Sequence, residues 1–132
     1  MFYDIMMMES DKMNDCLFCK IIKGDIPSFK IYEDDVVFAF LDINPKSNGH
    51  TLIVPKKHFK DIYDIDNNTL NHIVETAKKL MDILEEKLTC DGFTLAQNNG
   101  EVQEVKHFHL HVIPHYLEEQ TKSPEEVWNL LK

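Results

Sequence analysis

Three histidines alternate with apolar residues late in the chain, at positions 107, 109 and 111. A neutral imidazole is a nucleophile near pH 7, and a second imidazole can supply the proton that a leaving group needs. Side chains two residues apart on a strand lie on the same face, so His107, His109 and His111 would form one row. The middle residue, His109, is the natural nucleophile, and its neighbours would orient it and handle protons.

Two other interpretations of the histidine row stay open. It could be an exposed polar face that happens to hold histidines, which three at strict period two argue against. It could also be a metal site, since two histidines at i and i+2 on a strand can bind one zinc. A second motif, Cys16-x-x-Cys19, fits either a metal site or a redox-active pair.

Composition limits the class of protein. The chain has 132 residues, enough for one domain, with 43% hydrophobic and 28% charged residues. Its net charge of -9 argues against non-specific nucleic-acid binding. No apolar run approaches the roughly 18 residues of a membrane span. Three cysteines and no signal peptide predict a reducing, cytoplasmic location, where a metal site or a redox pair is favoured over a structural disulfide.

The patterning predicts one α+β domain with a five-stranded antiparallel sheet, one long helix and short N- and C-terminal helices. Residues 1–12, rich in methionine and acidic residues, are expected to be a peripheral extension of a single domain at 13–132. We expect strands at 28–33, 36–41, 51–54, 93–97 and 106–113. We expect helices at 15–22, at 70–88 with Asp66 or Asn68 as its cap and Gly92 just past its end, and after Ser123.

The His-x-His-x-His segment resembles the signature of the histidine triad (HIT) family of nucleotide hydrolases and transferases. The resemblance continues in order from residue 15 to residue 114. Residues Asp15 to Ile22 and Gly24 to Pro27 are similar to the family's zinc-bearing N-terminal segment. Its central strand is matched by Asp42, Ile43 and Pro45, followed by Gly49 to His58. Its phosphate-side turn is matched by Asn98 to Gly100.

The resemblance implies a HIT-like fold, a homodimer and a reaction at phosphorus. By this resemblance, His109 attacks the α-phosphorus of a nucleotide conjugate and forms a covalent nucleotidyl-histidine intermediate. His111 would bond to the phosphate or bridging oxygen and pass a proton, and His50 would orient the triad.

Nucleotide-binding roles also follow from the resemblance. Asp42 would accept hydrogen bonds from the ribose, and Asn98 would donate to a phosphate. Phe18, Phe40 and Ile43 would contact the base. The residue types leave alternatives open, because Phe40 and Ile43 could equally be core residues and Asp42 a turn residue.

A structural zinc site is implied as well, typical of the family's short zinc-binding branch. Its four ligands would be Cys16, Cys19, His58 and His107. His107 would then anchor the catalytic strand to the N-terminal segment instead of relaying a proton.

The function implied is hydrolysis of purine nucleoside phosphoramidates. Hydrolysis of dinucleoside polyphosphates is the near alternative, and a non-catalytic zinc-stabilised nucleotide-binding scaffold or a redox protein are alternatives of other classes. The chain departs from the family pattern before the triad, where Glu104 replaces a hydroxyl donor found in many members. It departs again at His115, where many relatives have arginine.

Overall fold

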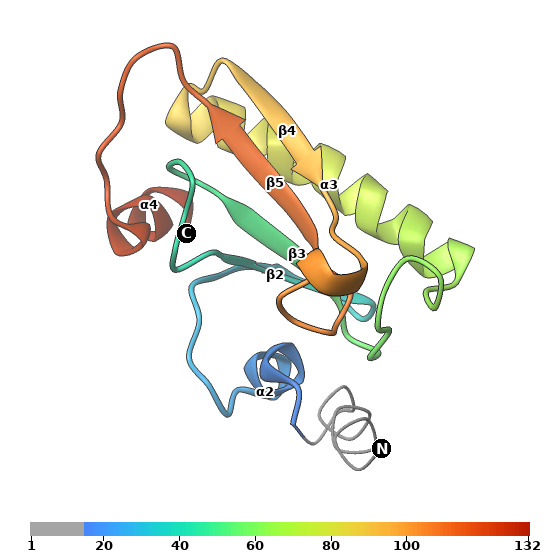
Figure 1. Ribbon diagram of the computed structural model, residues 1–132. Coiled ribbons are helices and arrows are strands. Elements are labelled where there is room, and N and C mark those ends of the chain that lie inside the picture. The colour runs from blue at the N-terminus through green and yellow to red at the C-terminus, as the bar shows by residue number, and fades with distance from the viewer. Residues whose placement is uncertain (1–14) are drawn as a thin grey trace.

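The computed structural model describes residues 15–132, so the extension expected at 1–12 lies outside the described residues. In the described part, five strands form one antiparallel sheet in the order β1-β2-β3-β5-β4 (Figure 1). The strands are β1 (Lys30–Glu33), β2 (Val37–Leu41), β3 (Thr51–Pro55), β4 (Gly92–Ala96) and β5 (Leu110–His115). With one long helix and short helices near both ends of the described chain, the predicted α+β class is confirmed.

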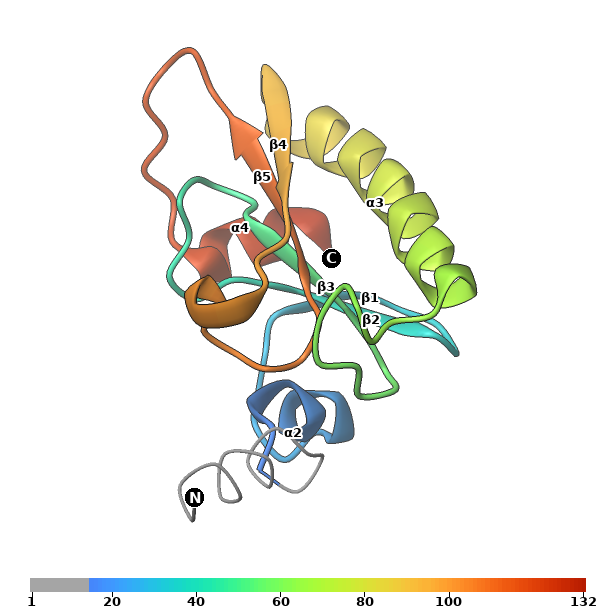
Figure 2. The same ribbon diagram turned by 45° about the vertical axis from the view of Figure 1, so that its right-hand side comes forward.

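Helices cover both faces of the sheet (Figures 1 and 2). The long α3 (Asn67–Leu88) packs on one face together with α4 (Pro124–Leu131), over a core that includes Ala39 and Ile53. The short α2 (Leu17–Lys23) packs on the other face. Because side chains alternate along a strand, β2 presents Phe38 and Phe40 to α2 while its other residues face α3.

The helix α3 begins at an ordinary N-cap residue and ends at a left-handed residue that is not a glycine. Of the two expected caps, Asp66 is the one used, and its carboxylate accepts a hydrogen bond from the Thr69 main-chain N–H. The helix ends at Leu88, as predicted, but glycine does not cap it. Thr89 ends the helix in the left-handed conformation, with φ 53°, and Gly92 instead begins β4.

The histidine segment is less regular than the predicted strand 106–113. The strand β5 begins only at Leu110 and continues through Pro114 to His115, two residues past the predicted end at 113. Residues 107–109 lie outside the sheet ladder because the loop after β3 holds them: the Phe108 N–H donates to the Phe59 carbonyl at 2.6 Å. Phe108 is still buried in the α3-side core, and its neighbours His107 and His109 face the α2 side.

Gly49 fixes the approach to β3 and therefore the position of His50. Its φ is +88°, a conformation that favours glycine. A Cβ at this position would meet Leu88 Cδ1 at 2.6 Å and Pro114 Cγ at 3.3 Å. The close packing of this turn against the end of α3 thus requires glycine.

The two edge strands differ in how they are covered. The indole N–H of Trp128 on α4 donates to the Lys30 carbonyl of β1, which protects that edge. At the other end of the sheet order, β4 carries the exposed side chains of Thr94 and Leu95. Within the part of the chain that the structure describes, no helix is long and apolar enough to cross a membrane.

Candidate active site

The fold gathers the three histidines predicted to be catalytic on the α2 face of the sheet. His50 precedes β3, His109 precedes β5, and His111 lies in β5 opposite Leu52 of β3. The rings of His109 and His111 are 4.9 Å apart between centroids, and those of His50 and His111 are 5.2 Å apart. The antiparallel pairing of β3 with β5 is what brings residues 50 and 111 together.

The hydrogen bond of His109 fixes which of its nitrogens can react. Its Nδ1 lies 2.8 Å from the His107 main-chain carbonyl oxygen, and a carbonyl only accepts hydrogen bonds. Nδ1 therefore carries the proton, and the lone pair of the neutral ring is on Nε2. A neutral imidazole held with a defined free lone pair is the state that a nucleophile requires.

A hydrogen bond joins the rings of His50 and His111, and its direction can be assigned. The Lys46 main-chain N–H donates to His50 Nδ1 at 3.1 Å, so the His50 proton must be on Nε2. His50 Nε2 lies 2.9 Å from His111 Nδ1 and donates to it. The proton of neutral His111 is then on its own Nε2, where it can serve as a donor.

Burial keeps these histidines neutral. It lowers the pKa of His50 and of His109 below the ordinary histidine value. Burial, together with the neighbouring His109 and His50, lowers the pKa of His111 to about 4. The whole row is thus uncharged at neutral pH, as the hydrogen bonds described above require.

Asp42 combines a turn role with a place at the site. One carboxylate oxygen accepts a hydrogen bond from the Asn44 N–H at 2.8 Å, a local turn contact. The other lies 3.6 Å from His50 Nε2. The turn contact left open by the sequence is therefore present, and the second carboxylate oxygen faces His50.

The residues predicted to contact a base differ in exposure. Phe18 of α2 is buried and its ring meets His109 nearly edge-on, with centroids 5.0 Å apart. Phe40 is buried against Phe18 at 5.6 Å. Ile43 is 71% exposed, which excludes the alternative that it is a core residue.

Two polar side chains of the connection between β4 and β5, those of Asn99 and Gln103, bind main-chain groups of the loop after β3. Asn98 is exposed just beyond β4, whereas its neighbour Asn99 is structural and accepts from the Ile62 N–H at 2.9 Å. Gln103 is buried and its side-chain amide donates to the Lys60 carbonyl at 2.6 Å. The Lys46 main-chain donor was missed, because a backbone N–H leaves no trace in residue type.

The four residues predicted to bind zinc lie together, with one possible ligand atom from each within 4.8 Å of the others. Cys16 Sγ and Cys19 Sγ lie 3.3 and 3.4 Å from His107 Nδ1, and Cys19 Sγ lies 3.3 Å from His58 Nδ1. A tetrahedral ion about 2.3 Å from sulfur and about 2.0 Å from nitrogen gives S···N edges of roughly 3.5 Å. The Cys2His2 set therefore fits a tetrahedral metal ion.

The protonation of the cluster supports the same fit. His107 Nε2 lies 2.8 Å from the Pro55 carbonyl and donates to it, which leaves the Nδ1 lone pair facing the two sulfurs. Burial, with the adjacent Cys16, raises the pKa of Cys19 to about 12. Two thiolates here thus need a cation between them.

A second group, Asp42, His50 and His111, also places possible ligand atoms within 4.8 Å of one another. Its hydrogen bonds argue against a metal. For His50 Nε2 to bind an ion, Nδ1 would have to carry the proton, which would then face the Lys46 N–H. The two clusters thus differ in chemistry: one suits a metal ion and the other a proton relay.

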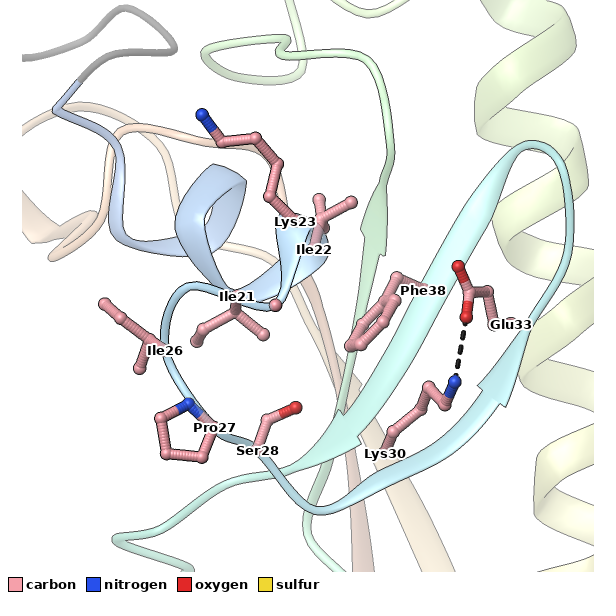
Figure 3. A pocket seen from close by; sticks show the side chains of 10 residues that line it. Ile21, Ile22, Lys23, Ile26, Pro27, Ser28, Lys30, Glu33 and Phe38 are labelled. Atoms are coloured by element: carbon pink, nitrogen blue, oxygen red, sulfur yellow. Dashed lines mark hydrogen bonds and ion pairs between the residues drawn. The ribbon is translucent and has the colours of Figure 1, made fainter.

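A cavity of about 280 Å³ lies apart from the histidines, between α2, the loop that follows it and the β1–β2 hairpin (Figure 3). Ile21, Ile26 and Phe38 line it, and Lys30 pairs with Glu33 at its side (Figure 3). The residues predicted to contact a base, Phe18, Phe40 and Ile43, are not among those that line this cavity.

Comparison with known proteins identifies this arrangement. The HIT domain model matches residues 23–118. The chain belongs to the HIT family. Because the matched residues begin after the cysteine pair, the family match itself says nothing about Cys16 and Cys19.

Relatives of known name and structure agree with this HIT assignment. An uncharacterized HIT-like protein of Methanocaldococcus jannaschii is 48% identical over 103 residues, 76% of this chain and 79% of that protein. Adenosine 5'-monophosphoramidase HNT1 of Saccharomyces cerevisiae is 45% identical over 101 residues, 75% of this chain and 61% of the yeast protein. A crystal structure of a Zn-bound histidine triad family protein from Mycobacterium smegmatis superposes with a TM-score of 0.84 at 34% identity, covering 91% of this chain and 92% of that one.

Proposed function

We propose that this HIT protein hydrolyses purine nucleoside phosphoramidates to a nucleoside monophosphate and a free amine. The observation that carries the proposal is the fixed tautomer of His109, whose Nδ1 donates to the His107 carbonyl and whose Nε2 lone pair adjoins the donor His111. The name of the yeast relative, an adenosine 5'-monophosphoramidase, supports this substrate class.

The first half of the reaction forms the covalent intermediate. His109 Nε2 attacks phosphorus, a P–N bond to His109 forms, and the P–N bond to the amine breaks. Nε2 of neutral His111 donates a hydrogen bond to the leaving nitrogen, and the proton that this nitrogen needs is taken up from solvent as the amine departs. The His109 ring, with Nδ1 protonated and Nε2 bonded to phosphorus, carries the positive charge, and His50 and His111 stay neutral.

The second half releases the mononucleotide. A water oxygen attacks phosphorus, its proton is released to solvent, and the bond to His109 Nε2 breaks. His109 returns to its starting state, so the net change is the hydrolysis of one P–N bond. Asp42 would hold the ribose hydroxyls, Asn98 a phosphate oxygen, and Phe18, Phe40 and Ile43 the base.

Zinc has a structural role in this proposal. Cys16, Cys19, His58 and His107 would hold it, and it would tie α2 to the segment that carries His109. The bound ion supplies no chemistry to the hydrolysis. A redox role for the cysteines is disfavoured because each sulfur contacts a histidine nitrogen.

The test is release of AMP from adenosine 5'-phosphoramidate by the purified protein, compared with its His109→Ala variant. We expect turnover by the wild type and loss of at least about 10³-fold in the variant. Equal turnover by both would overturn the role of His109. Nucleotide binding without turnover, unchanged in the variant, would support the non-catalytic scaffold instead.

We also propose that the protein is a homodimer joined through the β4 edge. Edge strands present unpaired main-chain groups that another chain can pair with. The exposed Leu95 side chain on this strand would be covered by the second copy.

A further inference from the structure

The turn before β3 places two main-chain groups against His50. The Lys46 N–H donates to His50 Nδ1 at 3.1 Å, and the His50 N–H donates to the Ser47 carbonyl at 3.2 Å. Lys46 and Ser47 belong to no helix or strand, so ladder hydrogen bonds do not hold them. The proton position on the His50 ring therefore depends on the other contacts that fix this turn.

The hydroxyl of Ser47 ties the turn to β5. The ladder between β3 and β5 ends at the pair Thr51 and Val112, so Pro114, two residues further along β5, has no opposing residue in β3. Pro114 is buried and has no N–H, and its buried carbonyl needs a donor. The Ser47 hydroxyl donates to that carbonyl, with the two oxygens 2.5 Å apart. This side-chain bond takes the place of the next ladder bond, one residue away from the Lys46 N–H.

A second hydroxyl holds the same turn from the other direction. The Tyr116 hydroxyl, just past the end of β5, donates to the Asn48 carbonyl at 2.7 Å. Burial raises the pKa of Tyr116 to about 12, so this hydroxyl keeps its proton at neutral pH. The turn is thus tied at two successive residues to the strand that carries His111.

These contacts close a ring through the candidate active site. The Lys46 N–H fixes the His50 ring, which donates to His111 across 2.9 Å. His111 and Pro114 share β5, and the Pro114 carbonyl binds the Ser47 hydroxyl next to Lys46. If the bond from Ser47 is lost, the turn can move relative to β5 and the Lys46 N–H no longer selects one nitrogen of His50. The His50 tautomer with its proton on Nδ1 then becomes accessible, and it cannot donate to His111 through Nε2.

We propose that Ser47 is a positioning residue of the hydrolysis, which sets the tautomers of His50 and His111 through its hydrogen bond to Pro114. Its hydroxyl proton is committed to the Pro114 carbonyl, so its role is to hold the turn and not to bind substrate. This inference rests on the proposed phosphoramidate hydrolysis and adds a residue that tunes its donor. The competing interpretation is that Ser47 only satisfies a buried carbonyl, in which case its loss would lower stability alone.

The test replaces Ser47 by alanine and by threonine. Ser47→Ala should lower kcat for adenosine 5'-phosphoramidate by roughly tenfold with little change in KM, because it removes a group that orients another. The ¹⁵N chemical shifts of the His50 and His111 rings should change from those of one tautomer to those of a mixture. Ser47→Thr keeps a hydroxyl and should restore both the rate and the shifts. Tyr116 still holds Asn48 in these variants, so we expect them to fold.

Ser123→Ala is the matched control, because the Ser123 hydroxyl also makes a hydrogen bond, which it accepts from the Glu126 N–H at the start of α4. It should lower the melting temperature without changing kcat or the histidine shifts. Unaltered shifts in Ser47→Ala, whatever its rate, would overturn the proposal, as would a threonine variant that is as slow as the alanine variant. If the wild type hydrolyses no phosphoramidate, the proposed function fails, and the ring shifts in Ser47→Ala still decide whether Ser47 sets the tautomers.

Discussion

His50 Nε2 and His111 Nδ1 lie 2.9 Å apart, and the direction of the hydrogen bond between them is set by a main-chain group. The Lys46 N–H occupies the other nitrogen of His50, so His50 can only donate to His111. The tautomer of His111, and with it the position of its transferable proton, is thus controlled from the loop before β3.

Replacing His50 should therefore impair chemistry more than binding. We expect His50→Ala to lower kcat by roughly 10- to 100-fold with a small change in KM, because His111 loses the donor that keeps its proton on Nε2. Steady-state kinetics check the rates, and ¹⁵N chemical shifts of the His111 ring check the tautomer. The control is His115→Ala, because His115 lies in β5 like His111 but its ring contacts Thr94. A change confined to KM, or an unaltered His111 tautomer, would contradict this role.

The lowered pKa of His111 leads to a second prediction, about stability at acid pH. Because its pKa in the folded protein is lowered from 6.5 to about 4, the unfolded chain takes up its proton first as the pH falls. Its contribution to the free energy of unfolding is complete above pH 6.5 and is lost progressively between 6.5 and 4. In an NMR titration the His111 ring should show a midpoint near 4. A midpoint near 6.5 would show that the imidazole is not shielded from water.

The metal cluster makes a prediction about stability. Cys19→Ser should remove the bound ion and lower Tm by about 10 °C or more, since metal binding contributes directly to folding. Metal content by mass spectrometry and the melting curve are the measurements. Cys90→Ser is the matched control, because Cys90 is a buried free cysteine outside the cluster and should keep one ion per chain. Equal metal content in both variants would exclude the Cys2His2 site.

The sheet, the long helix and the α+β class could be predicted because each depends on local patterning. Apolar periodicity marked 70–88, and turn residues separated the strands. The predicted strand at 106–113 failed at its start because the Phe108 N–H pairs with Phe59, a contact set by a distant loop. The end of α3 at Leu88 was predicted correctly, although the left-handed residue that follows it is Thr89 and not a glycine.

The grouping of the candidate histidines could be predicted from the sequence, but the position of the proton on each ring could not. The spacing of His107, His109 and His111 indicated a reactive row, and the resemblance to the HIT family added His50 to it. Which nitrogen carries each proton depends on two main-chain groups, the His107 carbonyl and the Lys46 N–H, and backbone groups leave no signal in a sequence. The distinction between the metal cluster and the proton relay likewise required these partners.

The exposed β4 edge leads to a prediction about assembly. If two copies pair along this edge, the wild type should sediment at about twice the 15.5 kDa of one chain. Leu95→Lys places a charge on the edge strand and should shift the protein toward the monomer at micromolar concentration. Leu130→Lys is the control, because Leu130 on α4 has the same 46% exposure as Leu95. If β4 is the interface, Leu95→Lys must weaken the dimer more than Leu130→Lys, although the two leucines are equally exposed. A monomeric wild type, or equal dissociation of both variants, would show that β4 is not the interface.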